Sequence, residues 1–410
     1  MINAASTTRS NAPIQVCVAK ASDIRWQLRM KLVAEAVVDA GYRCTLIGLT
    51  PQDGDTLHRD LRITYLLAES RLRFPVFSSF LRKIEKLLRV TAALWLNRFD
   101  ICCVHDFPVL VLVALKRLFR RFRLIYIGDE LEYSRNVSGL FGVLRNALVK
   151  QCLRLLLPFC DVIMQADVSR AEHMARVYHR TDKIQVLRNV PRSRIPAVEP
   201  MDLHQRLRWP RETVIFMYHG ILSPGRGIER SLGVLGNIAA DHPVGMLIVG
   251  WGKERYTTYL QGLIEHYERE ADQFKAYLAG PMEYEALLPW IQGADVGICL
   301  IENTCLSYYL AAPSKLYQYM QAGIPVIGSD FPEFRLVFRE ADCGLLADPE
   351  DESALTNAFR GMATDEKLRR EKGSAGRRAA MERYNWEREQ EVLLRALKGV
   401  APLNPTQSAE

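Results

Sequence analysis

A short stretch in the second half of the chain combines the residue types that hold a phosphate. Pro313, Ser314 and Lys315 stand at the predicted start of a helix that ends at Gly323, in APSKLYQYMQAGIPVI. Proline suits the first helical turn, where its missing N–H costs nothing, and glycine suits the helix exit. The free backbone N–H groups of that turn, with the Ser314 hydroxyl and the Lys315 ammonium, would bind an anion. Gln318, one turn along the same face, would hydrogen-bond the ribose of a nucleoside diphosphate.

Two glycine-rich segments follow predicted strands in the same half. The segment YHGILSPGRGIERS contains Gly220 and Gly227, and Arg226 stands at the predicted start of the next helix. A cation there opposes the helix dipole, so a bound anion would explain it; the alternative is an arginine in a surface turn. In VGWGKE, Gly250 and Gly252 would let a phosphate approach the N–H groups of the following helix. The third glycine of the dinucleotide fingerprint is absent, which argues against NAD.

Polar residues also end two buried strands in the first half of the chain. His105 stands in VHDFP and Asp129 in IGDE, each directly after an apolar run. Ligands bind beyond the carboxyl ends of parallel strands, so two such positions indicate a site, although each is also compatible with a capped loop. We expect no metal there. Asp53 and Asp55 suit a solvated turn, and the nine cysteines, which form no Cys-x-x-Cys pair, suit buried packing positions.

The charge of the chain is divided unevenly. Residues 1–200 carry a net charge of +13 and residues 201–410 a net charge of −6, which together give +7. Two basic amphipathic stretches, 80–89 and 115–123, suit an anionic membrane surface, with a solvated helix face as the alternative. No nucleic-acid motif accompanies them. The N-terminal sequence lacks a signal-peptide pattern and no apolar run reaches the roughly 18 residues of a membrane span, so we expect a reducing, cytoplasmic environment.

The elements that must position these residues alternate between short apolar strands and helical patterns along the whole chain. This alternation is typical of parallel sheets covered by helices, and it predicts an α/β fold of two Rossmann-like parallel-sheet domains that face a cleft. Four prolines between residues 190 and 213 interrupt the pattern and mark a linker. We predict a first domain over 1–190, a linker over 191–213 and a second domain over 214–382, with a helix at 383–398 that completes the first domain.

The predicted strands and helices are short and evenly distributed. Strands are expected at 14–19, 43–49, 63–67, 101–104, 124–127, 162–165, 184–187, 214–218, 244–249, 274–278, 296–300 and 325–327. Helices are expected at 24–40, 227–239, 254–268, 314–321 and 355–363. The tail from 368 to 397 is strongly helical and is long enough to run back across the first domain.

In their order and spacing these motifs resemble the retaining glycosyltransferases of the B fold, in particular the large family 4 of group 1 enzymes. The likeness covers nearly the whole chain and is strongest over 214–349, where YHGILSPGRGIERSLGVL, VGWGKE, AGPMEYEALLPWIQGADVGICL and PSKLYQYMQAGIPVIGSDFPEFR follow one another. The resemblance implies transfer of a sugar from a nucleotide-sugar donor, held mainly by the second domain, to an acceptor held by the first. It implies no metal and no other cofactor.

The resemblance also implies roles for individual residues. Arg226 matches the basic ligand of the diphosphate, and His105 matches the histidine beside the transferred sugar. Lys315 would share the phosphate charge with Arg226, and Asp129 would help His105 to orient the sugar and the acceptor hydroxyl. The nucleotide-sugar site would further include Met282, from GPMEY, together with Gly220, Gly227, Gly250, Gly252, Ser314 and Gln318.

The chain departs from the family pattern at three places. The Glu–seven residues–Glu motif has Leu310 and Gln318 at its two positions, Ile221 replaces an arginine, and Ala21-Ser22 replaces a glycine pair. We expect a transferase that builds a cell-surface polysaccharide or glycolipid and is peripheral on the inner face of the cytoplasmic membrane. Two alternatives stay open: a non-catalytic nucleotide-sugar-binding partner in a glycan-assembly complex, and a nucleotide-sugar epimerase of the same fold.

Overall fold

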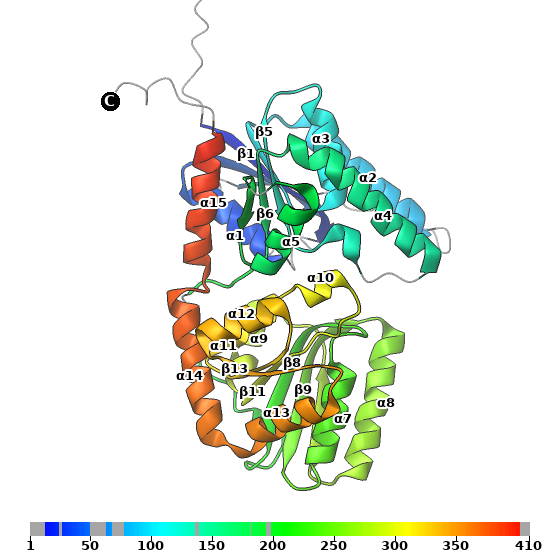
Figure 1. The fold of residues 1–410 in the computed structure, drawn as a ribbon, viewed down its shortest axis with the longest axis vertical. Coiled ribbons are helices and arrows are strands. Elements are labelled where there is room, and N and C mark those ends of the chain that lie inside the picture. The colour runs from blue at the N-terminus through cyan, green and yellow to red at the C-terminus, as the bar shows by residue number, and fades with distance from the viewer. Residues whose placement is uncertain are drawn as a thin grey trace, which may run out of the picture.

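The computed structural model describes residues 13–23, 27–49, 63–67, 78–135, 139–180, 182–193 and 198–401. These residues form two parallel β-sheets that follow one another along the long axis of the molecule, each flanked by helices (Figure 1). The predicted fold, an α/β chain with two Rossmann-like domains, is confirmed.

The first sheet has seven strands. They are β1 (Gln15–Asp23), β2 (Arg43–Leu49), β3 (Ile63–Leu67), β4 (Ile101–Val104), β5 (Arg123–Gly128), β6 (Val162–Gln165) and β7 (Ile184–Val186). The helices between them are α1 (Leu28–Asp39), α2 (Ser78–Leu96), α3 (Phe107–Arg117), α4 (Gly139–Leu156) and α5 (Val168–Tyr178), with two short 3-10 turns at Glu132–Ser134 and Leu157–Phe159. The strand order β3-β2-β1-β4-β5-β6-β7 brings the carboxyl ends of β1, β4, β5 and β6 to one edge.

The second sheet has six strands. They are β8 (Val214–Leu222), β9 (Val244–Gly252), β10 (Phe274–Ala279), β11 (Val296–Cys299), β12 (Val326–Ser329) and β13 (Gly344–Ala347), in the order β10-β9-β8-β11-β12-β13. The helices are α6 (Leu203–Leu207), α7 (Ile228–Ile238), α8 (Glu254–Glu270), α9 (Tyr284–Gln292), α10 (Leu306–Tyr309), α11 (Ser314–Ala322), α12 (Pro332–Ala341), α13 (Glu352–Thr364), α14 (Glu366–Glu382) and α15 (Trp386–Val400).

Strand β1 shows why the central strands are apolar throughout. Val16 and Val18 pack in the core cluster on one face of the sheet, and Cys17 and Ala19 pack in the cluster on the other face. Successive side chains of a strand point to opposite faces, and helices cover both faces here, so each position must be apolar. This is the origin of the short apolar runs in the sequence.

The C-terminal tail is helical, as its pattern predicts. It forms two helices, α14 and α15, separated at Arg383–Asn385, because the Asn385 side chain accepts from the Arg388 N–H at 3.1 Å and caps a new helix. Helix α14 packs along α11, and α15 packs along α1 (Figure 1). The indole of Trp386 is fully buried in the core of the first sheet. The chain therefore returns from the second sheet to the first at this break.

The predicted linker lies between the two sheets, since β7 ends at Val186 and β8 begins at Val214. It contains α6, in which Leu203 packs into the core of the second sheet. The exact domain limits stay a prediction.

Candidate active site

Helix α11 places a buried ammonium at its first turn. It begins at Ser314 with Pro313 as its N-cap residue, as predicted. The Lys315 side chain is 6% exposed, and its Nζ atom has no hydrogen-bond partner among the described residues. Burial, with a smaller contribution from the Arg226 guanidinium, lowers the pKa of Lys315 to about 7. A buried cation without an acceptor is unfavourable, so this is an arrangement that an anionic ligand would complete.

Arg226 is the second cation of this region. Its Nη2 atom donates to the Tyr308 hydroxyl at 2.9 Å, and its guanidinium carbon lies 4.5 Å from the centroid of the Tyr308 ring. Gly227 follows with a φ of 69° and is the N-cap residue of α7. A Cβ atom on Gly227 would lie 2.4 Å from Cβ of Leu300, so only glycine fits this close approach. The prediction that Arg226 stands at a helix start is confirmed.

Gly250 and Gly252 lie within a strand and not at the start of a helix, where they were predicted. Strand β9 does not end at residue 249 but continues to Gly252, alongside an equally extended β8. A Cβ atom on Gly250 would lie 1.8 Å from the main-chain oxygen of Gly220, and one on Gly252 would lie 2.5 Å from that of Leu222. The close approach of β8 therefore explains these two glycines without any phosphate. Contact of either with a nucleotide stays a prediction.

Gly220 lies within β8 and not in the predicted turn. Its φ is 126°, a value that side chains rarely adopt, and a Cβ atom there would lie 3.8 Å from Nζ of Lys315. The missing side chain thus keeps space open beside the unpartnered ammonium. His219, which precedes it, is buried and its Nε2 atom also lacks a partner among the described residues. Sequence reasoning missed His219 because nothing in its local pattern distinguishes it from a core histidine.

The other predicted nucleotide ligands lie on the same domain. Gln318 is buried on α11, and Ser314 is half-buried at its start. Met282 is partly buried and packs against the core of the second sheet. Leu310, at the first position of the family's acidic motif, is 8% exposed and packs in the core cluster of the first sheet. The absent carboxylate is therefore replaced by an apolar contact between the domains.

His105 follows β4 at the inner edge of the first sheet. Its side chain is buried, and its Nε2 atom has no partner in the described part of the chain. Burial lowers the pKa of His105 to about 3, which keeps the imidazole neutral at physiological pH. The next residue, Asp106, accepts from the N–H groups of Val109 and Ala21 at 3.0 and 2.7 Å and so caps α3. Of this pair, only the histidine has a buried polar side-chain atom without a partner among the described residues.

Asp129 lies close to His105 but is held by two cations. Its carboxylate oxygens are 2.6 Å from Nζ of Lys20 and 2.9 Å from Nη1 of Arg29. Burial alone would raise the pKa of Asp129, but Lys20 and Arg29 hold it well below its ordinary value. Because both of its oxygens pair with cations, Asp129 is better suited to holding Lys20 and Arg29 at this edge of the first sheet than to contacting an acceptor hydroxyl. Sequence reasoning missed Lys20 and Arg29, because only the strand order brings them to Asp129.

The described residues contain no group of three or more His, Cys, Asp or Glu side chains that could hold a metal ion. All nine cysteines are free thiols, seven of them buried. Asp53 and Asp55 lie outside the described residues.

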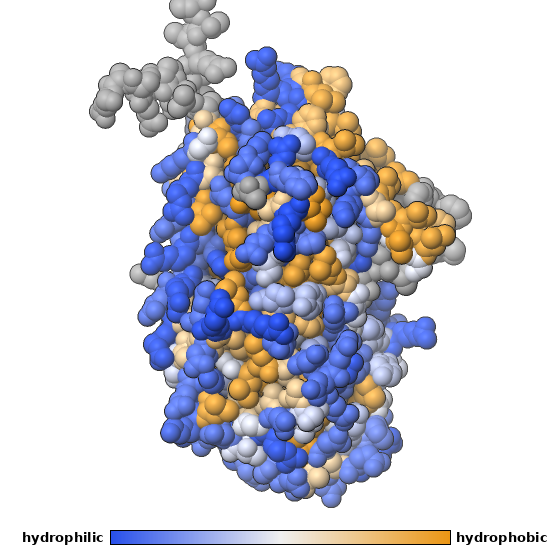
Figure 2. Space-filling model, viewed as in Figure 1, coloured by the Kyte–Doolittle hydropathy of each residue, from blue (hydrophilic) through white to orange (hydrophobic). Residues whose placement is uncertain are grey.

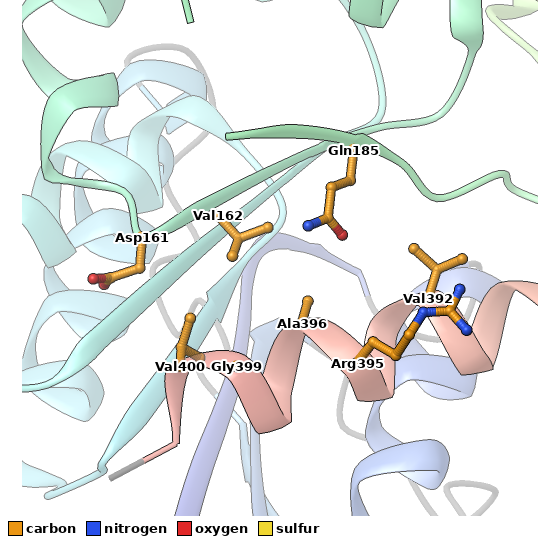
Figure 3. Close-up of a pocket in the computed structure, with 8 residues that line it drawn as sticks. All are labelled: Asp161, Val162, Gln185, Val392, Arg395, Ala396, Gly399 and Val400. Atoms are coloured by element: carbon orange, nitrogen blue, oxygen red, sulfur yellow. The ribbon is translucent and has the colours of Figure 1, made fainter. Parts of the chain in front are cut away.

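A cavity of about 510 Å³ lies away from these residues, between α15 and the strands β6 and β7 (Figure 3). Its charged groups already have partners, since Asp161 pairs with Arg117 at 2.8 Å and Arg395 pairs with Glu391 at 3.8 Å. Val162, Ala396 and Val400 form its apolar part. The cavity therefore adds no unpartnered charged group to the site.

Solved structures identify the class of fold. Sucrose-phosphate synthase from Thermosynechococcus elongatus superimposes with a TM-score of 0.76 at 17% identity, over 95% of this chain and 99% of that chain. HepE from Anabaena, solved in complex with UDP and glucose, gives a TM-score of 0.70 at 16% identity, over 94% and 100%. The fold is the two-domain B fold of glycosyltransferases.

The sequence comparisons add a family match for the second half of the chain. Residues 201–379 match the family model of the glycosyl transferases group 1. The matched residues include Arg226, Lys315 and Gln318. A phosphatidyl-myo-inositol mannosyltransferase from Mycobacterium leprae is 30% identical over 199 residues, which are 47% of this chain and 48% of that protein. The match thus spans about half the length of the curated relative.

Proposed function

We propose that this protein transfers a sugar from a nucleotide-sugar donor to an acceptor held by the first domain. The observation that carries the proposal is the buried ammonium of Lys315 near Arg226, at the start of α11, which has no hydrogen-bond partner in the described part of the chain. A diphosphate would pair with both cations and accept hydrogen bonds from the free N–H groups of the first helical turn. The group 1 domain, and the UDP bound in the HepE structure, support a nucleotide donor.

The same groups would stabilise the leaving diphosphate. Negative charge develops on it as the bond between sugar carbon and phosphate oxygen breaks, and Lys315, Arg226 and the helix N–H groups offset that charge. His105, neutral because it is buried, would accept a hydrogen bond at Nε2 from the sugar or the acceptor. Asp129 would keep Lys20 and Arg29 in place at the same edge. Retention of anomeric configuration rests on the family resemblance.

We further propose a lipid-linked acceptor and attachment of the first domain to the inner face of the cytoplasmic membrane. Exposed apolar side chains gather over α2, α3 and α4, along one edge of the first domain (Figure 2). Leu96, Leu118, Phe119, Leu140, Phe141 and Leu144 are among them, and Phe119 is 72% exposed. Arg120 and Arg121 follow Phe119 and are exposed. Apolar side chains bordered by arginines suit an anionic lipid surface. None of the described helices is long and apolar enough to span a bilayer.

The structure changes which residues of the basic stretch 115–123 can serve this purpose. Helix α3 ends at Arg117, and Phe122 is buried against Phe99 with ring centroids 4.9 Å apart. Arg117 and Arg123 pair with Asp161 at 2.8 and 3.1 Å. Phe122 is therefore not available for insertion into lipid, and two of the four arginines of this stretch already hold the fold together.

Calorimetry with UDP, GDP and ADP tests the proposal for the donor. We expect the wild type to bind one of them, and Lys315→Met to lose most of that affinity. Lys367→Met, which changes an exposed lysine on α14, is the matched control. The best nucleotide then selects radiolabelled donor sugars for transfer assays with lipid-linked acceptors. A wild type that binds none of the three nucleotides contradicts the proposal.

One observation favours a second candidate, nucleotide-sugar binding without transfer. Leu310 packs against the first domain and Gln318 is neutral, so both carboxylates of the family motif are missing. A binding protein would bind the donor but would neither transfer nor hydrolyse its sugar with any acceptor. Product analysis without acceptor separates the third alternative, an epimerase, which would convert the sugar of the donor.

A further inference from the structure

The first turn of helix α5, in the first domain, is capped by the second domain. The N–H groups of Val168 and Ser169 donate to the two carboxylate oxygens of Glu333 at 3.2 and 2.8 Å. Glu333 lies in the first turn of α12, and its side chain is fully buried. An N-cap side chain usually accepts from the second or third N–H group of its helix, but Asp167 at the N-cap of α5 makes no such bond. A residue of the other domain takes that role.

Asp167 and Arg170 extend the contact. One carboxylate oxygen of Asp167 accepts from the Ala312 N–H at 3.1 Å, and the other lies 3.0 Å from Nη1 of Arg170. Arg170 donates to the main-chain oxygen of Ser307 from Nε and Nη2, at 3.2 and 2.6 Å. Asp167, Arg170 and Ser307 are all buried. Water therefore competes little for these hydrogen bonds, and each is costly to leave unmade.

Both second-domain partners adjoin a cation of the candidate donor site. Ala312 stands three residues before Lys315, where α11 begins. Ser307 precedes Tyr308, whose hydroxyl accepts from Arg226 at 2.9 Å. The first turn of α5 thus contacts both segments that hold the two cations.

We propose that Glu333, Asp167 and Arg170 form an interdomain clasp that positions Lys315 and Arg226. The effect of the clasp on donor binding rests on the proposed function. The hydrogen bonds of the clasp are independent of that function. If the domains part, Glu333 leaves α5, and Ala312 and Ser307 lose their partners. The segments that hold both cations are then released together, so closing the domains and completing the diphosphate site are one event. All three are positioning residues, since each acts through Lys315 or Arg226.

Hydrogen–deuterium exchange on the full chain tests the clasp without substrate. We expect Glu333→Ala to speed exchange about tenfold or more at the Val168 and Ser169 amides, which lose charged acceptors. We also expect faster exchange at the Ala312 amide, although Glu333 makes no hydrogen bond to it. Glu333→Gln keeps one amide oxygen as an acceptor and should restore part of the protection. Glu366→Ala, at an exposed glutamate in the first turn of α14, is the matched control and should change none of the three amides.

Faster exchange at Val168 and Ser169 with unchanged exchange at Ala312 would overturn the proposal, because the substitution would then act on α5 alone. Arg170→Lys gives an independent variant if Glu333→Ala folds poorly. It removes the two-atom contact with Ser307 and should speed exchange around Tyr308; wild-type exchange there would count against the clasp.

Nucleotide binding separates the clasp from the proposed function. With the nucleoside diphosphate that binds best among UDP, GDP and ADP, Glu333→Ala should bind about fivefold or more weakly, while Glu366→Ala binds as the wild type does. Unchanged affinity in Glu333→Ala despite faster exchange at Ala312 would overturn the coupling to the donor site. If the wild type binds none of these nucleotides but exchange at Ala312 still responds to Glu333→Ala, the proposed function fails and the clasp stands.

Discussion

The Nζ atom of Lys315 lies 3.6 Å from the centroid of the Tyr218 ring. The hydroxyl of Tyr218 donates to the main-chain oxygen of Ile221 at 2.7 Å, so its ring is fixed in place. An aromatic face attracts a cation and replaces part of the hydration that burial removes. The Tyr218 ring does not replace all of the lost hydration, so burial still lowers the pKa of Lys315 to about 7. The Lys315 amine is therefore poised to take up a proton when an anion binds.

The affinity for a nucleoside diphosphate should fall as the pH rises above about 7. The pKa of Lys315 is about 7 in the free protein, and a bound diphosphate favours the ammonium form and raises it. Above pH 7 the complex must take up a proton, and affinity falls by up to about tenfold per pH unit. Calorimetry from about pH 7 to pH 9, in buffers of different ionisation enthalpy, measures both the affinity and the proton uptake. A Lys315→Met variant should show neither effect, and equal wild-type affinity at both ends of this range would contradict the assignment.

Lys315→Ala should weaken donor binding more than Gln318→Ala does. Loss of a charged phosphate ligand from a desolvated site costs roughly 2–5 kcal/mol, whereas loss of a neutral hydrogen bond costs about 1 kcal/mol. Both residues lie on α11 and both are buried, so general damage to the helix would affect them alike. Titration calorimetry gives the two free energies. Equal losses would mean that the ammonium does not contact phosphate.

Gly250→Ala should destabilise the second domain by about 2 kcal/mol or more, as overpacking against fixed backbone does. The new Cβ atom would lie 1.8 Å from the Gly220 oxygen, in a paired strand that cannot yield locally. Gly262→Ala on α8 is the control: nothing lies within 4 Å of its Cβ position, so we expect a gain of about 0.5–1 kcal/mol. Urea unfolding measures both. A neutral Gly250→Ala would mean that β8 and β9 separate at this point.

Membrane binding should depend on apolar side chains more than on arginines. Replacing Leu118 and Phe119 with serine should abolish flotation with anionic liposomes at both low and high salt, since insertion of apolar side chains is not screened. Replacing Arg120 and Arg121 should matter only at low salt, each contributing about 1 kcal/mol. Tyr259→Ser, at an exposed aromatic residue of the second domain, is the control. Undiminished flotation of the Leu118 and Phe119 double variant would refute this orientation on the membrane.

Local sequence determined the features whose physics is local. Alternating apolar strands and helices predict two parallel sheets, because a strand covered on both faces must be apolar throughout. Pro313, Lys315 and Gly323 predict the bounds and charge of α11, because helix ends are set by the few residues around them. For the same reason the position of Arg226 before α7 could be predicted from its neighbours.

The tertiary structure decided everything that depends on which strands and helices become neighbours. Asp129 looks like a free carboxylate in the sequence, but Lys20 and Arg29, which pair with it, precede it by about a hundred residues. Gly250 looks like a phosphate-binding glycine, yet the close approach of the neighbouring strand β8 is sufficient to require glycine there. Glu333 carries no signal at all, since its partners are main-chain N–H groups of the other domain. Such contacts leave no periodicity or motif along the chain, because they are made only when the two sheets are assembled and the domains meet.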